Sequence, residues 1–107
     1  MYLTINRFRV RPGHEAAFEA LWTGRESKLP QLRGFVEFHL MRGESHADHT
    51  VYLSHTLWES RAAFEAWTKS DAFRSSHRGA GAHGAMYLGP PELECLESVQ
   101  RIAAPGR

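Results

Sequence analysis

The chain has 107 residues, with 13 basic and 12 acidic side chains and a formal net charge of +1. This length suits a single domain with one core, and a composition of 42% apolar and 23% charged residues argues against disorder. No basic run is dense enough to predict nucleic-acid binding, and no apolar run approaches the ~20 residues that span a bilayer.

Two features predict a soluble protein of the cytoplasm. Cys95 is the only cysteine, so it can form neither an internal disulfide nor a metal-binding cysteine pair. A lone cysteine favours a reducing compartment. Charged side chains, among them Arg7, Arg9 and Arg11, interrupt the first twenty residues, which therefore lack the apolar core of a signal segment.

Two hydrophobic periods define the elements of the N-terminal half. Residues 2–10 (YLTINRFRV) alternate as a strand does, and Arg-Pro-Gly at 11–13 ends that strand. Apolar residues within 14–29 have helical spacing, and Pro30 marks the end of the predicted helix. The sequence FVEFHLMR at 35–42 predicts a second strand.

The next segment contains a strand, a helix and a small-residue loop. A third strand is predicted over 49–58, after the polar turn GESHADH. Ser60 is a good N-cap for a helix over 61–69, and a second short helix is predicted over 71–77. The glycines and alanines of 79–85 predict a loop.

A last strand over 92–102 completes the order strand, helix, strand, strand, helix, strand. This order predicts one α+β domain over 1–107 of the ferredoxin-like βαββαβ type, an antiparallel sheet with both helices on one face. An uncovered apolar sheet face is normally buried by a partner, so we expect a homodimer packed sheet to sheet as a β-barrel. Depending on register, that face carries many of the residues Leu3, Ile5, Tyr2, Val51, Leu53, Leu93 and Leu96.

Three polar side chains occupy positions where hydrophobic residues are expected. Asn6 shares its strand face with Phe8, Arg25 lies on the apolar stripe of the first helix, and His77 follows Phe73 by four residues. Each has a structural explanation of its own: an amide at the sheet rim, an arginine that extends to water, or a charge at a helix end. Because a buried unpaired polar group costs about 1–3 kcal/mol, three that converge on one cavity suggest a ligand.

Other histidines offer competing sites. His46 and His49 lie in the polar turn with one aspartate, an arrangement that binds a transition metal weakly, and a solvated turn is the simpler interpretation. His39 and His55 lie on predicted strands and His83 lies in the glycine-rich loop. Any of these three competes with the helical histidine as an imidazole that faces the cavity.

Three blocks of the sequence resemble the antibiotic biosynthesis monooxygenase superfamily, and within it the IsdG-type haem-degrading monooxygenases. They are INRFRVRPGHEAAFEALW, LRGFVEFHLMRG and, most strongly, WESRAAFEAWTKSDAFRSSH. The haem-degrading branch is distinguished by an Asn, Trp and His trio, which Asn6, Trp67 and His77 match. Other members use the same fold on quinones, polyketides or small aldehydes and lack that trio.

The resemblance implies a role for each member of the trio. His77 would be the proximal ligand of the haem iron, and Asn6 would donate a hydrogen bond to dioxygen on the opposite side. Trp67 would lie against the porphyrin and push it out of plane. Arg25 would lie near the distal pocket, as an arginine does in some relatives. Periodicity alone adds an apolar lining of Phe8, Trp22, Phe64 and Phe73, and proximity alone suggests Arg74 and Arg78 as propionate partners.

The implied activity is oxidative cleavage of haem to a ring-opened tetrapyrrole with release of iron. Haem would be both cofactor and substrate, with O2 and an unidentified electron donor, and no other metal is expected. One alternative is a cofactor-independent monooxygenase acting on a small aromatic or quinol, in which His77 or His83 would be a base. A second alternative is a non-catalytic haem-binding dimer.

Overall fold

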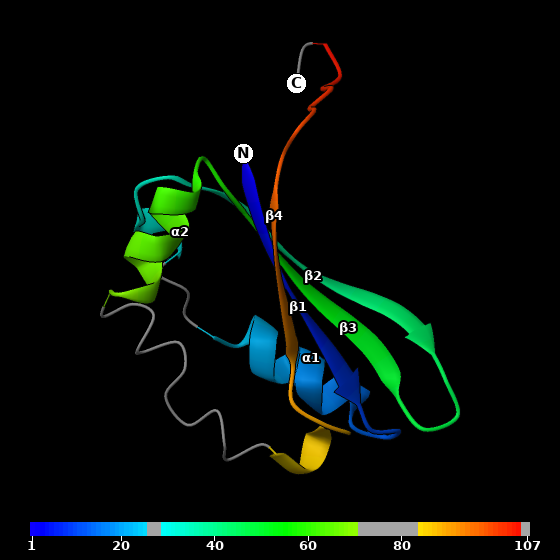
Figure 1. The fold of residues 1–107 in the computed structure, drawn as a ribbon. Helices are drawn as coiled ribbons and strands as arrows, with labels where there is room; N and C mark the ends of the chain where they lie inside the picture. Colours follow the sequence, from blue (N-terminus) through cyan, green and yellow to red (C-terminus); the bar gives the residue numbers. More distant parts are fainter. Residues whose placement is uncertain (26–28, 71–83, 106–107) are drawn as a thin grey trace.

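The computed structural model describes residues 1–25, 29–70 and 84–105 (Figure 1). Four strands form one sheet in the order β2-β3-β1-β4, and every neighbouring pair is antiparallel. This is the predicted ferredoxin-like arrangement. In chain order the elements are β1 (Tyr2–Val10), α1 (Glu15–Thr23), the 3-10 turn η1 (Leu29–Gln31), β2 (Phe35–Ser45), β3 (Thr50–Trp58), α2 (Arg61–Thr68) and β4 (Glu92–Glu97).

Both helices pack on the same face of the sheet. Side chains alternate along β1, so Tyr2 and Phe8 point to one side of it. Phe64 of α2 contacts Tyr2, with ring centroids 5.8 Å apart, and Phe18 of α1 contacts Phe8 at 5.4 Å. We call this side the helix-covered face and the other the open face; Figure 1 shows the two helices as separate blocks along the strands.

Each helix has its own set of buried contacts. Under α1, Phe18 is fully buried against Tyr52 of β3, with ring centroids 4.6 Å apart. Under α2, the fully buried Trp58 contacts the rings of Phe64 and Trp67. Two hydrophobic contacts at opposite ends of the strands therefore hold the helices apart on one sheet.

A polar contact also fixes α1 to the sheet. The Tyr52 hydroxyl donates to Oε2 of Glu19 at 2.5 Å, and the Arg42 guanidinium makes two hydrogen bonds of 2.8 Å to the same carboxylate. These bonds stabilise the ionised carboxylate, so they lower the pKa of Glu19, the tyrosine contributing more than the arginine. Burial is the main reason why the pKa of Tyr52 is raised.

The first helix is shorter than predicted. It ends at Thr23, whereas the apolar spacing predicts a helix to Leu29, which instead begins a 3-10 turn. Gly24 follows as the C-cap, and the Arg25 amide bonds back three residues to Trp22 at 3.3 Å, which tightens the chain out of the α-helix. Glycine is the weakest helix former after proline. Arg25 consequently lies outside the helix, and its predicted place on the apolar stripe is wrong.

The second helix and the third strand agree with the prediction within one residue at each end. The Ser60 hydroxyl accepts a hydrogen bond from the Ala63 amide at 3.2 Å, which confirms the N-cap. β2 continues to Ser45, beyond its predicted end at residue 42. The short helix predicted over 71–77 lies outside the described residues, as does most of the predicted loop, of which Gly84 and Ala85 begin a 3-10 turn.

The last strand ends at Glu97 and does not reach residue 102 as predicted. The reason is its partner: Glu97 pairs with Tyr2, the first residue of β1, so no strand remains to pair with the following residues. Val99 and Ile102 are 97% and 85% exposed on a stretch that leads away from the sheet in Figure 1.

The register corrects the predicted open face at two positions. Tyr2 contacts α2, and Leu93 pairs with Asn6, so both lie on the helix-covered face. Among the described residues, no helix is long and apolar enough to cross a membrane. The open face carries the apolar side chains Leu3, Ile5, Met41, Val51, Leu53, Leu57 and Leu96.

Candidate functional site

A strip of small polar side chains lies between the two helices on the helix-covered face. It consists of Thr4 and Asn6 from β1 and Ser54 and Thr56 from β3; we call it the polar strip. Its position follows from the register, because α2 covers the Tyr2–Trp58 end of the strands and α1 covers the Phe8–Tyr52 end. Within the strip, Thr4 is engaged: its hydroxyl accepts from the Trp58 indole N–H at 3.3 Å.

Asn6 stands in the middle of the polar strip. It is half-buried, with Ser54 of β3 directly opposite on one side and Leu93 of β4 on the other. Among the described residues, no hydrogen bond is made by the Asn6 side chain. Its amide is therefore available to a ligand. Leu93 is 59% exposed, which places an uncovered apolar surface beside that amide.

Trp67 and Phe64 extend along one side of the site from α2. The ring of Trp67 lies 5.5 Å from that of Trp58 and 6.2 Å from that of Phe64, in tilted contacts. The hydroxyl of Ser70 donates to the Trp67 carbonyl at 2.6 Å, so a side chain satisfies one carbonyl of the last helical turn. Because Trp58 is fully buried, its contact with Trp67 holds the indole of Trp67 in this position.

Trp22 occupies the other side, at the end of α1. Its ring is stacked on Phe38 of β2, with centroids 6.0 Å and planes 11° apart, and contacts Phe8 edge-on at 5.6 Å. Its Nε1–H is buried and has no acceptor within the described part of the chain. Arg25 is exposed, and its guanidinium carbon lies 4.4 Å from the Trp22 ring centroid, a cation–π contact.

Phe8 lies deeper than the predicted lining. It is buried in the cluster with Val10, Phe18 and Tyr52, where it supports Trp22 from below. Of the predicted lining residues that the structure describes, Trp22 and Phe64 are half-buried and adjoin the polar strip.

Two of the competing histidines lie on the open face, away from the polar strip. His39 and His55 are cross-strand neighbours with ring centroids 5.7 Å apart, and His55 pairs with Ile5 on the open face. In the polar turn the rings of His46 and His49 are stacked at 4.7 Å. No group of three or more potential metal ligands occurs among the described residues.

Part of the predicted site lies outside the described residues. This part comprises the proximal histidine and its neighbours His77, Phe73, Arg74, Arg78 and His83. The structure brings Asn6, Trp67, Trp22 and Phe64 to one face.

Sequence reasoning missed two residues of this face, Ser54 and Leu93. The signal for Ser54 was present: in HTVYLSHTLW it falls two residues after Tyr52 and four before Trp58, on the face that those aromatic residues share. The sequence predicts Leu93 on the open face only subject to register, and the pairing with β1 places it on the other face.

This face combines aromatic and apolar surface with one available amide. The apolar side chains come from both helices and from β4, and the amide lies on β1 between them. Such a surface suits a large, flat, mostly apolar ligand that carries one hydrogen-bond acceptor.

Comparisons with known proteins place the fold and the sequence in one family. A staphylobilin-producing haem oxygenase of Staphylococcus saprophyticus is 32% identical over 79 residues, 74% of this chain and 75% of that protein. The haem degrader MhuD of Mycobacterium tuberculosis, solved with two haems in its active site, is 26% identical with a TM-score of 0.74, over 96% of this chain and all of that one.

A monooxygenase structure from Bacillus cereus shares the fold at a TM-score of 0.76 and 14% identity, over 96% of this chain and 97% of that one. The antibiotic biosynthesis monooxygenase profile matches residues 1–79, nearly three quarters of the sequence. The chain therefore belongs to the antibiotic biosynthesis monooxygenase family.

Proposed function

We propose that this protein is a haem-degrading monooxygenase, which opens the porphyrin with O2 and an electron donor and releases the iron. The observation that carries the proposal is the half-buried Asn6 amide, free of protein partners among the described residues and lying between helices that carry Trp67 and Trp22. The relatives named as haem oxygenases and haem degraders support the same chemistry. Because the lone Cys95 suits a reducing compartment, we place the reaction in the cytoplasm.

The described residues suit haem in both shape and chemistry. Trp67 and Phe64 on one side and Trp22 on the other offer aromatic surface for a flat macrocycle, and the exposed Leu93 extends that surface to the β4 edge. Bound haem supplies the iron, and its own porphyrin is the part that is cleaved. An amide is a suitable donor there, because it gives a hydrogen bond without titrating.

We assign the following roles to residues of this chain. His77 binds the iron through a neutral imidazole, a ligand that iron accepts readily. Asn6 donates a hydrogen bond on the opposite side. Trp67, whose ring contacts the buried Trp58, would lie against the macrocycle and would favour its distortion. His39 and His55 are excluded from these roles within one protomer, because they lie on the open face.

A haem titration of the purified protein, followed by ascorbate and catalase in air, tests the proposal. We expect a saturable Soret shift that bleaches after the reductant is added. His77→Ala should abolish the shift, whereas His46→Ala, a histidine of the β2–β3 turn, should leave it intact. Asn6→Ala should bind haem and fail to bleach it. A shift without bleaching in the wild type would indicate a haem carrier, and no shift would indicate a cofactor-independent monooxygenase.

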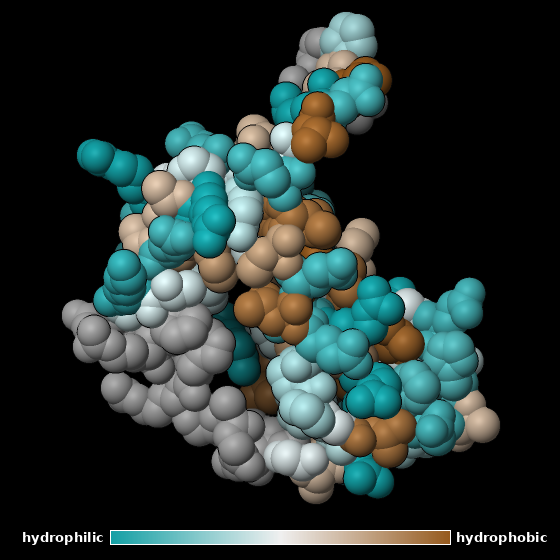
Figure 2. Space-filling model, in the orientation of Figure 1, coloured by the Kyte–Doolittle hydropathy of each residue, from teal (hydrophilic) through white to brown (hydrophobic). Residues whose placement is uncertain are grey.

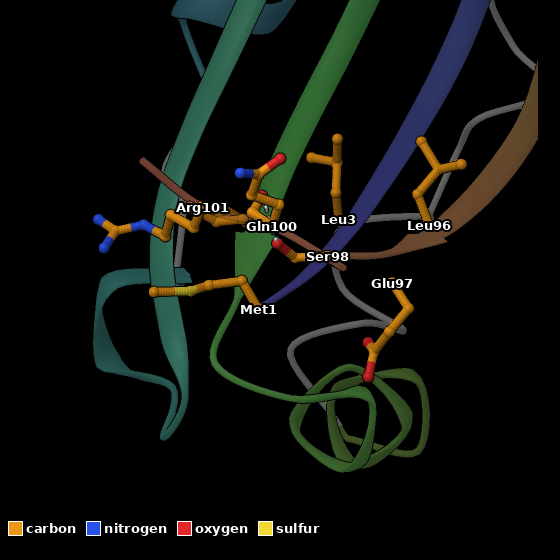
Figure 3. Close-up of a pocket in the computed structure, with 8 residues that line it drawn as sticks. Met1, Leu3, Leu96, Glu97, Ser98, Gln100 and Arg101 are labelled. Atoms are coloured by element: carbon orange, nitrogen blue, oxygen red, sulfur yellow. Dashed lines mark hydrogen bonds between the residues drawn. The ribbon is translucent and has the colours of Figure 1, made fainter. Parts of the chain in front are cut away.

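We also propose that two copies associate through their open faces. Met41 and Leu96 are 50% and 41% exposed there, and Leu3, Leu57 and Leu96 line an apolar hollow of about 310 Å³ (Figure 3). Figure 2 shows hydrophobic side chains gathered over the central strands, and others on the C-terminal stretch. A second copy would bury these exposed apolar side chains.

Two substitutions on β4 test the dimer with a matched control. Leu96 lies on the open face and Leu93 on the helix-covered face of the same strand. Light scattering should give twice the chain mass of 12.2 kDa for the wild type and for Leu93→Asp, and the monomer mass for Leu96→Asp. Haem affinity should fall in Leu93→Asp more than in Leu96→Asp. A monomeric wild type would contradict the association.

A further inference from the structure

Ser54 is a buried residue in the centre of the candidate site. It is 4% exposed, on the central strand β3, and its side chain makes no hydrogen bond among the described residues. Within the described residues the fully buried side-chain atoms without a partner are Trp22 Nε1 and His55 Nδ1, so the Ser54 oxygen keeps some access to solvent. The hydroxyl is therefore free to donate to a neighbouring side chain.

Trp22 lies over the part of the sheet that carries Ser54. Its indole contacts Phe38 on β2 and Phe8 on β1, and β3 runs between those two strands. Phe38 pairs with Thr56, whereas Phe8 pairs with the residue two positions before Ser54. The line between the two phenylalanines crosses β3 near Ser54, so the indole lies over the part of the sheet that carries this serine.

Asn6 is a polar side chain within reach of Ser54. The two residues are directly opposite in the β1–β3 register, and Cβ atoms of such pairs are about 4.5–5.5 Å apart. On its other side Ser54 pairs with Leu40, which offers no polar atom. The diagonal neighbour Thr4 already accepts a hydrogen bond from Trp58. A hydroxyl and a carboxamide at this separation can meet after rotation of their side chains.

We infer that Ser54 is a positioning residue for Asn6: its hydroxyl donates to Oδ1 of Asn6 when ligand binds, which leaves both Nδ2 hydrogens to face the ligand. This inference rests on the proposed function, which gives Asn6 its role as donor. A carboxamide that can rotate presents its oxygen to a ligand as readily as its nitrogen. A donor at Oδ1 removes that ambiguity, and it also strengthens the amide as a donor by polarising it.

Cyanide binding to the haem-loaded ferric protein measures this donor without turnover. Cyanide accepts a hydrogen bond through its nitrogen. Its affinity therefore reports whether the Asn6 amide donates to a ligand bound on the side of the haem opposite His77. We expect Asn6→Ala to weaken cyanide binding about tenfold and Ser54→Ala about threefold. Because Ser54 acts through Asn6, the double variant should bind cyanide as Asn6→Ala does. Ser45→Ala, which removes a hydroxyl paired with Thr50 at 3.1 Å elsewhere on the sheet, should match the wild type.

The outcomes separate this inference from the proposed function. If Asn6→Ala weakens cyanide binding but Ser54→Ala does not, or if the two effects multiply in the double variant, Ser54 does not position Asn6 and the inference fails alone. If Asn6→Ala leaves cyanide affinity unchanged, the donor role of Asn6 is wrong and the inference falls with it. Urea denaturation of Ser54→Ala verifies that the fold is retained.

Discussion

Replacement of Gly34 by alanine should damage the contact between α2 and the sheet. Gly34 has a φ of +84°, and a Cβ there would overlap Cβ of Ala63 in the first half of α2. Its carbonyl also accepts the Glu59 amide at 2.8 Å, so the turn cannot move away freely. Gly13 provides the matched control: its φ is +88°, but no atom lies within 4 Å of an added Cβ.

The expected magnitudes follow from these two differences. A positive φ costs an alanine about 1–2 kcal/mol. The substitution also lowers the conformational entropy of the unfolded chain, which stabilises the folded state by about 0.4–1 kcal/mol. Gly13→Ala should therefore lower the free energy of unfolding by about 1 kcal/mol. The overlap with Ala63 adds about 1–3 kcal/mol of overpacking, so Gly34→Ala should lose about 2–4 kcal/mol.

Urea denaturation followed by circular dichroism measures both losses. Adding Ala63→Gly to Gly34→Ala removes the clashing Cβ, and it should restore most of the difference from Gly13→Ala, less about 0.5–1 kcal/mol for a glycine in a helix. Equal losses in the two single variants, or no recovery in the double variant, would refute the argument that Gly34 is required by its contact with Ala63.

Three further outcomes are expected. The pKa of Glu19 is lowered, so its ionised carboxylate stabilises the fold above the ordinary value of 4.5, and this stabilisation is lost as the pH falls through the lower folded-state value. In urea denaturation at pH 7, 5 and 3, the free energy of unfolding should therefore fall less with acid for Glu19→Gln than for the wild type. An unchanged acid profile would contradict this. Ser60→Ala should lower the free energy of unfolding by about 0.5–2 kcal/mol through loss of the bond to Ala63, as read from denaturation midpoints. Trp67→Phe should bind haem with a flatter macrocycle, and an unchanged out-of-plane resonance Raman signature would count against the distorting role.

Local patterns predicted most of the fold because the hydrophobic residues of each helix or strand repeat with the period of that element. Alternation defined the first strand, and the serine N-cap defined the start of α2. The errors occurred at element ends that are determined by a pairing strand or by a single residue. Gly24 ended α1 within an apolar stripe that continues past it, and β4 ended where β1 offers no further residue to pair with.

The chemistry of the site stays a prediction, and the structure tests only where its described residues lie. Asn6 and Trp67 lie on one face, and the amide of Asn6 is free among the described residues. The predicted place of Arg25 on the helical stripe was wrong because it depended on the helix that Gly24 ends, and its role near the ligand stays a prediction. Ser54 was overlooked because its significance depends on Asn6, which only the β1–β3 register places directly opposite it.

The most direct test of the account identifies the products after haem-loaded protein reacts with ascorbate and catalase in air. Mass spectrometry should detect a ring-opened tetrapyrrole, and a ferrous-iron chelator should capture about one iron per haem consumed. The same mixture prepared with Asn6→Ala should retain intact haem. Intact haem in the wild type after reduction, or bleaching that continues undiminished in Asn6→Ala, would contradict the account.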